Sequence, residues 1–243
     1  MISGDCGLWI DSDIWRYELG LNRWFNGPTM ITPRYVFGSA DCGSVACVAG
    51  GEQVSEEVLN SAEKYNPESK SWESLPSMNM RRKFCSGYMD SKFYVIGGIN
   101  ENRDLLTCGE CYDFERNVWE LIPNMIEDDP SSHSSQPQDF MAVVNNELYY
   151  LDIPSRHLKV YLKNNNTWKI VGREPASIEL EGWGVTLKSL GDELVLICRT
   201  LRNRPTLDII MCFCTPSPEL DNVEWRVLDF HRQWRTRPFI IVV

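Results

Sequence analysis

The 243-residue sequence lacks a long uninterrupted apolar run and has little positive charge. No apolar segment reaches the roughly 20 residues that a membrane-spanning helix needs, and the first residues show no secretory signal pattern. The 24 Lys and Arg are outnumbered by 34 Asp and Glu, which gives a formal net charge of -10. Because such a chain repels phosphate backbones, we expect neither nucleic acid nor a membrane as its partner.

Clustered metal ligands and nucleophile motifs are also scarce. The three histidines fall in unrelated places, at His133, His157 and His231. Cys108 and Cys111 have the C-x-x-C spacing without a second pair, whereas Cys212 and Cys214 are expected on one face of a strand. No P-loop or G-x-S-x-G sequence occurs. We therefore expect no metal, no cofactor and no catalysis, and we expect reduced thiols in an intracellular protein of the nucleus or cytoplasm.

Aromatic residues, in contrast, are abundant and recur at a regular interval. Four Tyr/Trp pairs share a spacing of seven residues, and their Trp residues lie 48, 47 and 49 positions apart. A further Trp, Trp225, follows after 57 positions. The pairs are Tyr17 and Trp24, Tyr65 and Trp72, Tyr112 and Trp119, and Tyr161 and Trp168. This periodicity indicates an internal repeat of about 47 to 57 residues.

Other residues keep the same phase within the repeat. Apolar runs end in a glycine doublet at Gly50-Gly51 and again at Gly97-Gly98, where positive φ and close backbone approach are expected. Turn-forming residues separate each Tyr from its Trp, as in Asn66-Pro67-Glu68-Ser69, which predicts a hairpin. Short strands in a four-stranded meander at this period are typical of a β-propeller blade.

The repeated glycine doublet, Tyr and Trp resemble the kelch repeat. Several longer runs are similar to the plant F-box/kelch-repeat proteins, namely Thr32-Pro33-Arg34, Phe37–Ala40, Val58–Glu63, Leu75–Asn79, Lys92–Gly98 and Gly182–Gly184. The resemblance implies a kelch propeller that selects a protein substrate for a cullin-RING ubiquitin ligase. In that family an N-terminal F-box docks onto the Skp-type adaptor of the ligase.

We therefore predict an all-β, kelch-type β-propeller over residues 1–243 with about four and a half four-stranded blades. Ile14–Glu18 and Asn22–Phe25 are expected to form only the outer pair of the first blade, and no F-box helices are expected in residues 1–30. The array is thus predicted to be N-terminally incomplete, either as a fragment or as a short natural form. The expected repeats are approximately 1–30, 31–77, 78–125, 138–173 and 182–228, with a flexible loop at 126–137 and a candidate closing strand at 238–243.

Meander topology predicts which loops share an edge of the blades. The connection from the second to the third strand and the connection between successive repeats should emerge on the same side, where binding residues concentrate. The candidate protein-binding residues on this side are Arg34, Arg81, Arg82, Lys83, Asn100 and Arg103. Arginine suits an acidic motif, but Arg34 and Arg82 could instead pair internally, for instance with Glu52 or Glu63.

The function favoured by the sequence is binding of a protein substrate of unknown identity, as in the recognition module of an SCF-type ubiquitin ligase. A Skp-type adaptor is expected as a partner only if an F-box exists upstream. Two alternatives stay open: an oxidoreductase or hydrolase on the same scaffold, and a truncated fragment without function.

Overall fold

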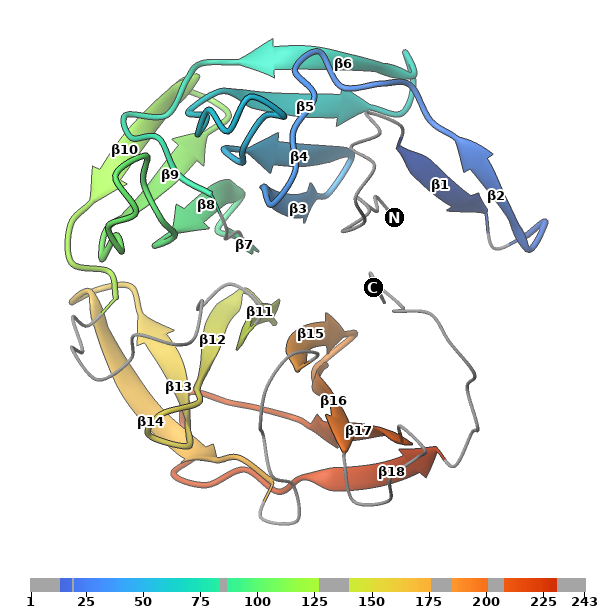
Figure 1. Ribbon diagram of the computed structural model, residues 1–243. Helices are drawn as coiled ribbons and strands as arrows, with labels where there is room; N and C mark the ends of the chain where they lie inside the picture. Colours follow the sequence, from blue (N-terminus) through green and yellow to red (C-terminus); the bar gives the residue numbers. More distant parts are fainter. Residues whose placement is uncertain are drawn as a thin grey trace. The chain divides into compact units, whose positions relative to one another are not determined.

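The structure is a computed structural model, and it describes residues 14–18, 20–83, 87–126, 140–175, 185–200 and 208–230. These residues form four 4-stranded antiparallel sheets and one 2-stranded hairpin (Figure 1). The sheets confirm the prediction of an all-β fold built from kelch-type blades. They fall into two compact units, residues 14–126 and 140–230. None of the described segments forms a helix long and apolar enough to cross a membrane.

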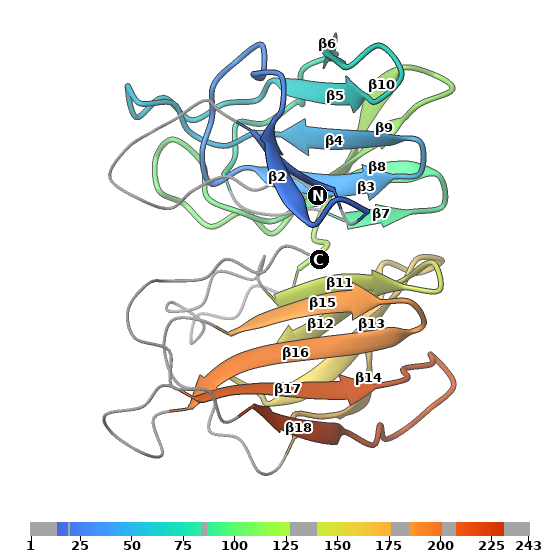
Figure 2. The same ribbon diagram turned by 90° about the vertical axis from the view of Figure 1, so that its right-hand side faces the viewer.

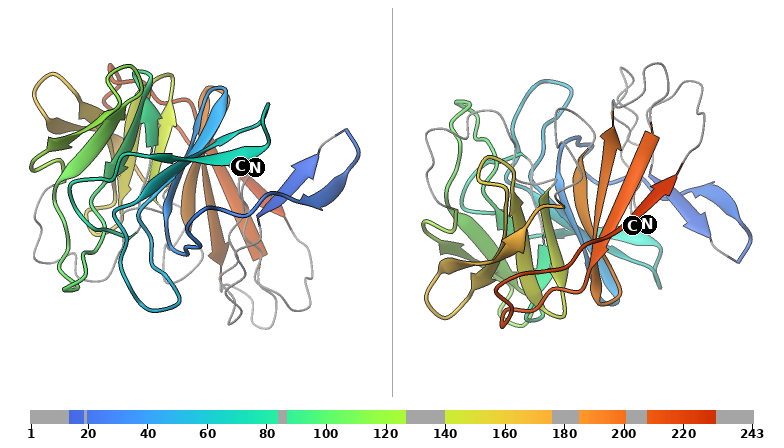
Figure 3. Two further views of the ribbon diagram at one scale, coloured as in Figure 1. Left: turned by 90° about the horizontal axis from the view of Figure 1, so that it is seen from above. Right: turned by 90° about the horizontal axis from the view of Figure 1, so that it is seen from below.

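The first unit contains the hairpin and two sheets. The hairpin pairs β1 (Trp15–Glu18) with β2 (Arg23–Asn26) and is the separate blue element in Figure 3, close to the expected outer pair. The first sheet comprises β3 (Gly38–Cys42), β4 (Val45–Ala49), β5 (Ala62–Asn66) and β6 (Ser71–Leu75). The second comprises β7 (Gly87–Met89), β8 (Lys92–Ile96), β9 (Gly109–Asp113) and β10 (Val118–Ile122). Strands pair in chain order within each sheet, and β3 contacts β7 and β8.

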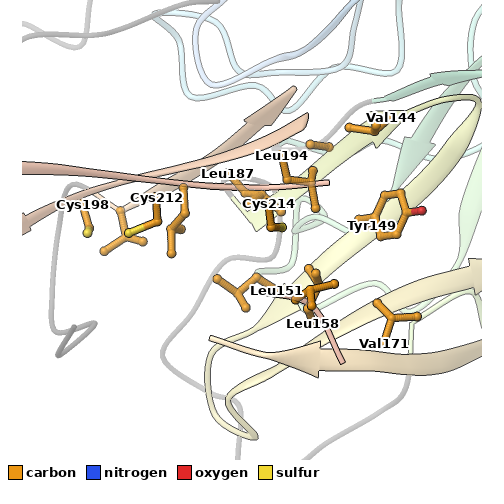
Figure 4. Close-up of a cluster of buried hydrophobic side chains, with 14 of the residues drawn as sticks. Val144, Tyr149, Leu151, Leu158, Val171, Leu187, Leu194, Cys198, Cys212 and Cys214 are labelled. Atoms are coloured by element: carbon orange, nitrogen blue, oxygen red, sulfur yellow. The ribbon is translucent and has the colours of Figure 1, made fainter. Parts of the chain in front are cut away.

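The second unit contains two further meanders around an apolar core. One sheet comprises β11 (Met141–Val144), β12 (Glu147–Asp152), β13 (His157–Leu162) and β14 (Thr167–Arg173). The other comprises β15 (Thr186–Leu190), β16 (Glu193–Thr200), β17 (Asp208–Cys214) and β18 (Arg226–Phe230), which extends past the predicted end of the repeat at 228. Leu151, Leu158, Leu187 and Leu194 pack between the two sheets (Figure 4).

The side chains of Cys212 and Cys214 lie on the same face of β17, as their spacing of two residues predicted. Cys212 and Cys214 both enter the main core of the second unit, whereas Phe213 packs in a separate cluster. Figure 4 shows Cys212 near Cys198, and Cys214 near Leu187 and Leu194. In the described ranges these three cysteines form no disulfide, and all three are buried. They therefore behave as small apolar side chains.

The spacing of seven between Tyr and Trp follows from the turn between the third and fourth strands. In the three Tyr/Trp pairs that lie in four-stranded sheets, each Tyr is directly opposite its Trp, and the ring centroids are 5.3 to 5.4 Å apart. The residue five positions after each Tyr has positive φ: Asn22 (49°), Lys70 (52°), Asn117 (56°) and Asn166 (52°). A left-handed residue at this point closes the turn and returns the chain to the next strand.

Each of three Trp residues also ties its blade to the preceding repeat. The indole Nε1 of Trp72 donates to the Pro28 carbonyl at 2.9 Å, and that of Trp119 donates to the Pro76 carbonyl at 2.7 Å. Trp225 makes the same kind of bond to the Arg173 carbonyl at 2.7 Å. These bonds hold the three indole rings against the preceding repeat.

Several sequence-based expectations fall on residues outside the described ranges. These are the loop at 126–137 beyond Ile126, the closing strand at 238–243, the start of the chain at 1–13, His133, His231 and the Gly182–Gly184 run.

Candidate protein-binding rim

One edge of the first unit carries four connecting segments, residues 28–37, 52–59, 76–83 and 99–106, which we name the rim. They lie on the left side of the unit in Figure 2, opposite the two-residue turns that join β3 to β4 and β7 to β8. Backbone bonds connect the segments in pairs. Tyr35 and Glu52 exchange two bonds at 2.9 Å, and Lys83 and Ile99 exchange two at 3.0 and 3.1 Å. The predicted sharing of one edge is therefore confirmed.

The glycine doublets allow these segments to approach one another. Gly50 and Gly51 have φ values of 64° and 93°, and Gly97 and Gly98 repeat them at 64° and 90°. A Cβ on Gly51 would lie 2.7 Å from the Tyr35 carbonyl oxygen, so any other residue would push the segments apart. The positive φ and the close approach are both as predicted.

Beneath the rim, Arg34 forms a buried ion pair with Glu63. The guanidinium Nη2 lies 2.5 Å from Glu63 Oε1, and Nη1 donates to the carbonyls of Gly50 and Ser61. Glu63 also accepts from the backbone N–H groups of Ile31 and Thr32. Burial lowers the pKa of Arg34, and the adjacent Glu63 carboxylate opposes this shift.

Arg82 repeats this arrangement one blade later, with Glu110 as its partner. Arg82 Nη2 lies 2.9 Å from Glu110 Oε1, while Nη1 donates to the carbonyls of Gly97 and Cys108 at 3.0 Å. Glu110 accepts from the N–H groups of residues 79 and 80. Arg82 is 1% exposed and Glu110 is fully buried.

The two arginines are therefore internal braces, and the expectation that they lie exposed on a binding surface needs correction. The alternative of internal pairing describes both arginines. Arg34 pairs with Glu63, one of the two partners considered, whereas Arg82 pairs with Glu110, which was not considered. Glu110 was missed by the sequence analysis. Its signal was available, because a Glu stands two residues before Tyr65 and before Tyr112.

Arg81 and Lys83 do reach the rim surface, but each is already paired. Arg81 Nη1 lies 2.8 Å from Glu57 Oε1 and donates to the Val58 carbonyl at 2.6 Å. Lys83 Nζ lies 2.6 Å from Glu52 Oε2. The rim is therefore not a strip of unpaired basic side chains suited to an acidic motif.

The two loops at the tip of the rim have the same backbone. In the first, Gln53 N–H donates to the Glu57 carbonyl, and Glu56 N–H donates to the Gln53 carbonyl. In the second, the equivalent bonds join residue 100 to 104 and residue 103 to 100. Glu56 (φ 64°) and Arg103 (φ 68°) occupy the same left-handed position, 47 residues apart.

Asn100 has an internal role in its loop. Its Oδ1 accepts from the N–H groups of Asn102 and Asp104 at 2.9 and 2.8 Å, and its Nδ2 donates to Asp104 Oδ2 at 3.1 Å. Arg103 is exposed at the tip of the same loop. Of the six residues that the sequence singled out for binding, Arg103 is the most openly displayed.

The structure also places the cysteines considered as metal ligands. Cys108 lies beside Arg82 and Met80, whereas Cys111 lies beside Glu120, and burial raises the pKa of Cys111 to about 11. In the described ranges, no group of three His, Cys, Asp or Glu side chains is arranged to hold a metal ion.

Comparisons with known proteins agree with this architecture. A family model of the kelch motif matches residues 48–79 and 80–126. F-box/kelch-repeat protein At3g27150 of Arabidopsis thaliana is 49% identical over 190 residues, which cover 76% of this chain and 45% of that protein. F-box/kelch-repeat proteins SKIP11 and At1g74510 of the same plant are 41% and 38% identical, over 76% and 88% of this chain and 41% and 51% of their own lengths. The chain thus spans about half the length of these relatives. It is a kelch-repeat protein, related through its kelch portion to the plant F-box/kelch-repeat proteins.

Proposed function

We propose that the rim of the first unit binds a protein. We further propose that, in a protein that also carries an F-box, this module selects the substrate of an SCF-type ubiquitin ligase. The kelch motifs and the similarity to F-box/kelch-repeat proteins support this proposal. The F-box of such a protein would dock onto the Skp-type adaptor.

The observation that carries the proposal is that two residues with large charged side chains, one at each loop tip, have a left-handed backbone conformation. Glu56 and Arg103 each adopt a φ that costs a non-glycine residue about 1 to 2 kcal/mol. Glycine would adopt the same backbone without that cost, so the side chains themselves favour a role in contact with a partner. The scaffold beneath is rigidly braced by Arg34–Glu63 and Arg82–Glu110.

The test removes these side chains while keeping the backbone. Glu56→Gly and Arg103→Gly, alone and together, are expected to reduce proximity labelling or co-purification of partners in plant cells without lowering the melting temperature. Lys70→Gly is the matched control, because Lys70 has the same left-handed φ in a turn at the opposite edge of the blade. An unchanged set of partners in the double variant would contradict a role for the rim.

We also propose that the protein acts without catalysis in the nucleus or cytoplasm. The cysteines of the described ranges form no disulfide and are largely buried, which suits a reducing compartment. Copper- or zinc-dependent turnover in the purified full chain would favour the alternative of a kelch-type oxidoreductase or hydrolase.

A further inference from the structure

The two tip loops have the same backbone conformation but carry opposite charges at the equivalent positions 56 and 103. Glu56 and Arg103 are equivalent by position and by φ, yet one side chain is anionic and the other cationic. Over the described ranges, neither side chain makes an ion pair or a hydrogen bond. Among the other surface charges of the rim, Glu57 pairs with Arg81 and Glu52 pairs with Lys83.

Lys83 connects the bases of the two loops. Its Nζ binds Glu52 at the start of the first loop, and its backbone exchanges bonds with Ile99 at the start of the second. Because β3 also contacts β7 and β8, the two loops belong to neighbouring blades of one unit. One bound segment can therefore run across both tips.

The residues next to Glu56 and Arg103 restrict which side chains a bound segment can carry. Val54 is 65% exposed beside Glu56 and offers an apolar contact. Glu101 and Asp104 flank Arg103, so a run of acidic residues would be repelled there and again at Glu56. A run of basic residues would be repelled by Arg103 itself.

We propose that the rim recognises a protein segment of mixed charge, with a basic side chain opposite Glu56, an apolar one over Val54 and an acidic one opposite Arg103. This inference rests on the proposed function of the rim. Exposed charge pairs contribute little affinity but discriminate between partners, because like charges brought together are unfavourable. The order of charges along the segment would then set which proteins are accepted.

The experiment uses a displayed library of random 12-residue peptides as the probe, selected against the full chain and against the double variant Glu56→Arg/Arg103→Glu. This exchange preserves net charge. The control variant, Glu68→Lys/Lys70→Glu, makes the same kind of exchange in an exposed turn at the opposite edge.

The expected result is that peptides selected on the native chain carry both charges. They should bind the rim variant about 10-fold more weakly or worse, bind the control variant unchanged, and recover affinity for the rim variant when their charges are reversed. Peptides that bind the native chain and both variants equally would overturn the charge rule while leaving protein binding intact. Selection that enriches no peptide on any of the three proteins would count against both the charge rule and the proposed function.

Discussion

At the scale of single residues, Arg82 joins two neighbouring blades. Its carbonyl accepts from Gly51 N–H of the first sheet at 2.9 Å, and its guanidinium binds the Gly97 and Cys108 carbonyls and Glu110 of the second. Its Nε is the one buried side-chain nitrogen or oxygen without a protein partner in the described ranges, whereas Arg34 Nε donates to the Thr32 carbonyl at 3.2 Å. Glu110 supplies the negative charge that compensates the buried Arg82 guanidinium.

Removing that charge should be costly. We predict that Glu110→Ala lowers the free energy of unfolding by about 3 to 5 kcal/mol, because it leaves the Arg82 charge buried and unpaired. Glu110→Gln should cost less, since an amide oxygen can still accept from Asn79 and Met80. Chemical denaturation measures both.

The control for this prediction is Glu57→Ala. Glu57 and its partner Arg81 are 53% and 40% exposed, so breaking this pair should cost only about 0 to 1 kcal/mol. Equal effects of Glu110→Ala and Glu57→Ala would show that burial does not govern the strength of these pairs.

At the scale of the strand elements, the turn that separates the Tyr from the Trp in each of the four pairs has one backbone conformation, and its left-handed residue is Asn in all but one of them. Asn22, Asn117 and Asn166 take the left-handed position, whereas Lys70 takes it in the first complete sheet. Tyr112 and Tyr161 also donate from their hydroxyls to Asn117 and Asn166 at 2.6 and 2.9 Å. Asparagine tolerates this conformation far better than lysine does.

Lys70→Asn should therefore stabilise the protein. We expect a gain of about 0.5 to 1 kcal/mol from relief of the left-handed strain, with a further acceptor for the Tyr65 hydroxyl. Thermal unfolding of this variant is best compared with the reciprocal change, Asn117→Lys, which should lower stability. A lower melting temperature for Lys70→Asn would refute the account of the turn.

The elements themselves were largely predictable. The Tyr/Trp spacing, the glycine doublets and the turn formers are local features, and they gave the hairpins and blades of residues 31–122 correctly. Where the doublet is replaced by Tyr150-Leu151 or Cys198-Arg199, β12 and β16 continue through these positions as regular strands. The chain path differs there because only glycine readily supplies the positive φ that follows β4 and β8.

At the scale of the whole molecule, the two units are stabilised by different chemistry. All the buried charged residues of the described ranges, Arg34, Glu63, Arg82, Glu110 and Asp113, belong to the first unit. The second unit is held by an apolar core that includes Cys198, Cys212 and Cys214. Burial raises the pKa of Cys198 to about 11 and that of Cys214 to about 12.

These thiols should make the protein sensitive to alkaline pH. A thiol with a raised folded pKa binds its proton longer in the folded state, so its contribution is complete below an unfolded pKa of about 8.5 and is lost as pH rises towards 11 or 12. The slope should not exceed about 1.4 kcal/mol per pH unit for each thiol. Denaturation midpoints measured from pH 8 to 10 should fall, and Cys198→Val should flatten the decline. Midpoints that stay constant over this range would contradict the assignment.

The sequence by itself determined what depends on neighbouring residues along the chain: the repeat, the strands, the turns and the edge at which the loops emerge. Only the tertiary structure decided which charges are displayed. Arg34 and Arg82 resemble Arg81 and Arg103 in sequence, but their carboxylate partners lie 29 and 28 residues away. Strand pairing brings Glu63 and Glu110 beneath the rim, where burial demands a full set of partners, and it leaves Arg103 at a loop tip in water. The physical reason is that the cost of burying a charge depends on the groups around it in space.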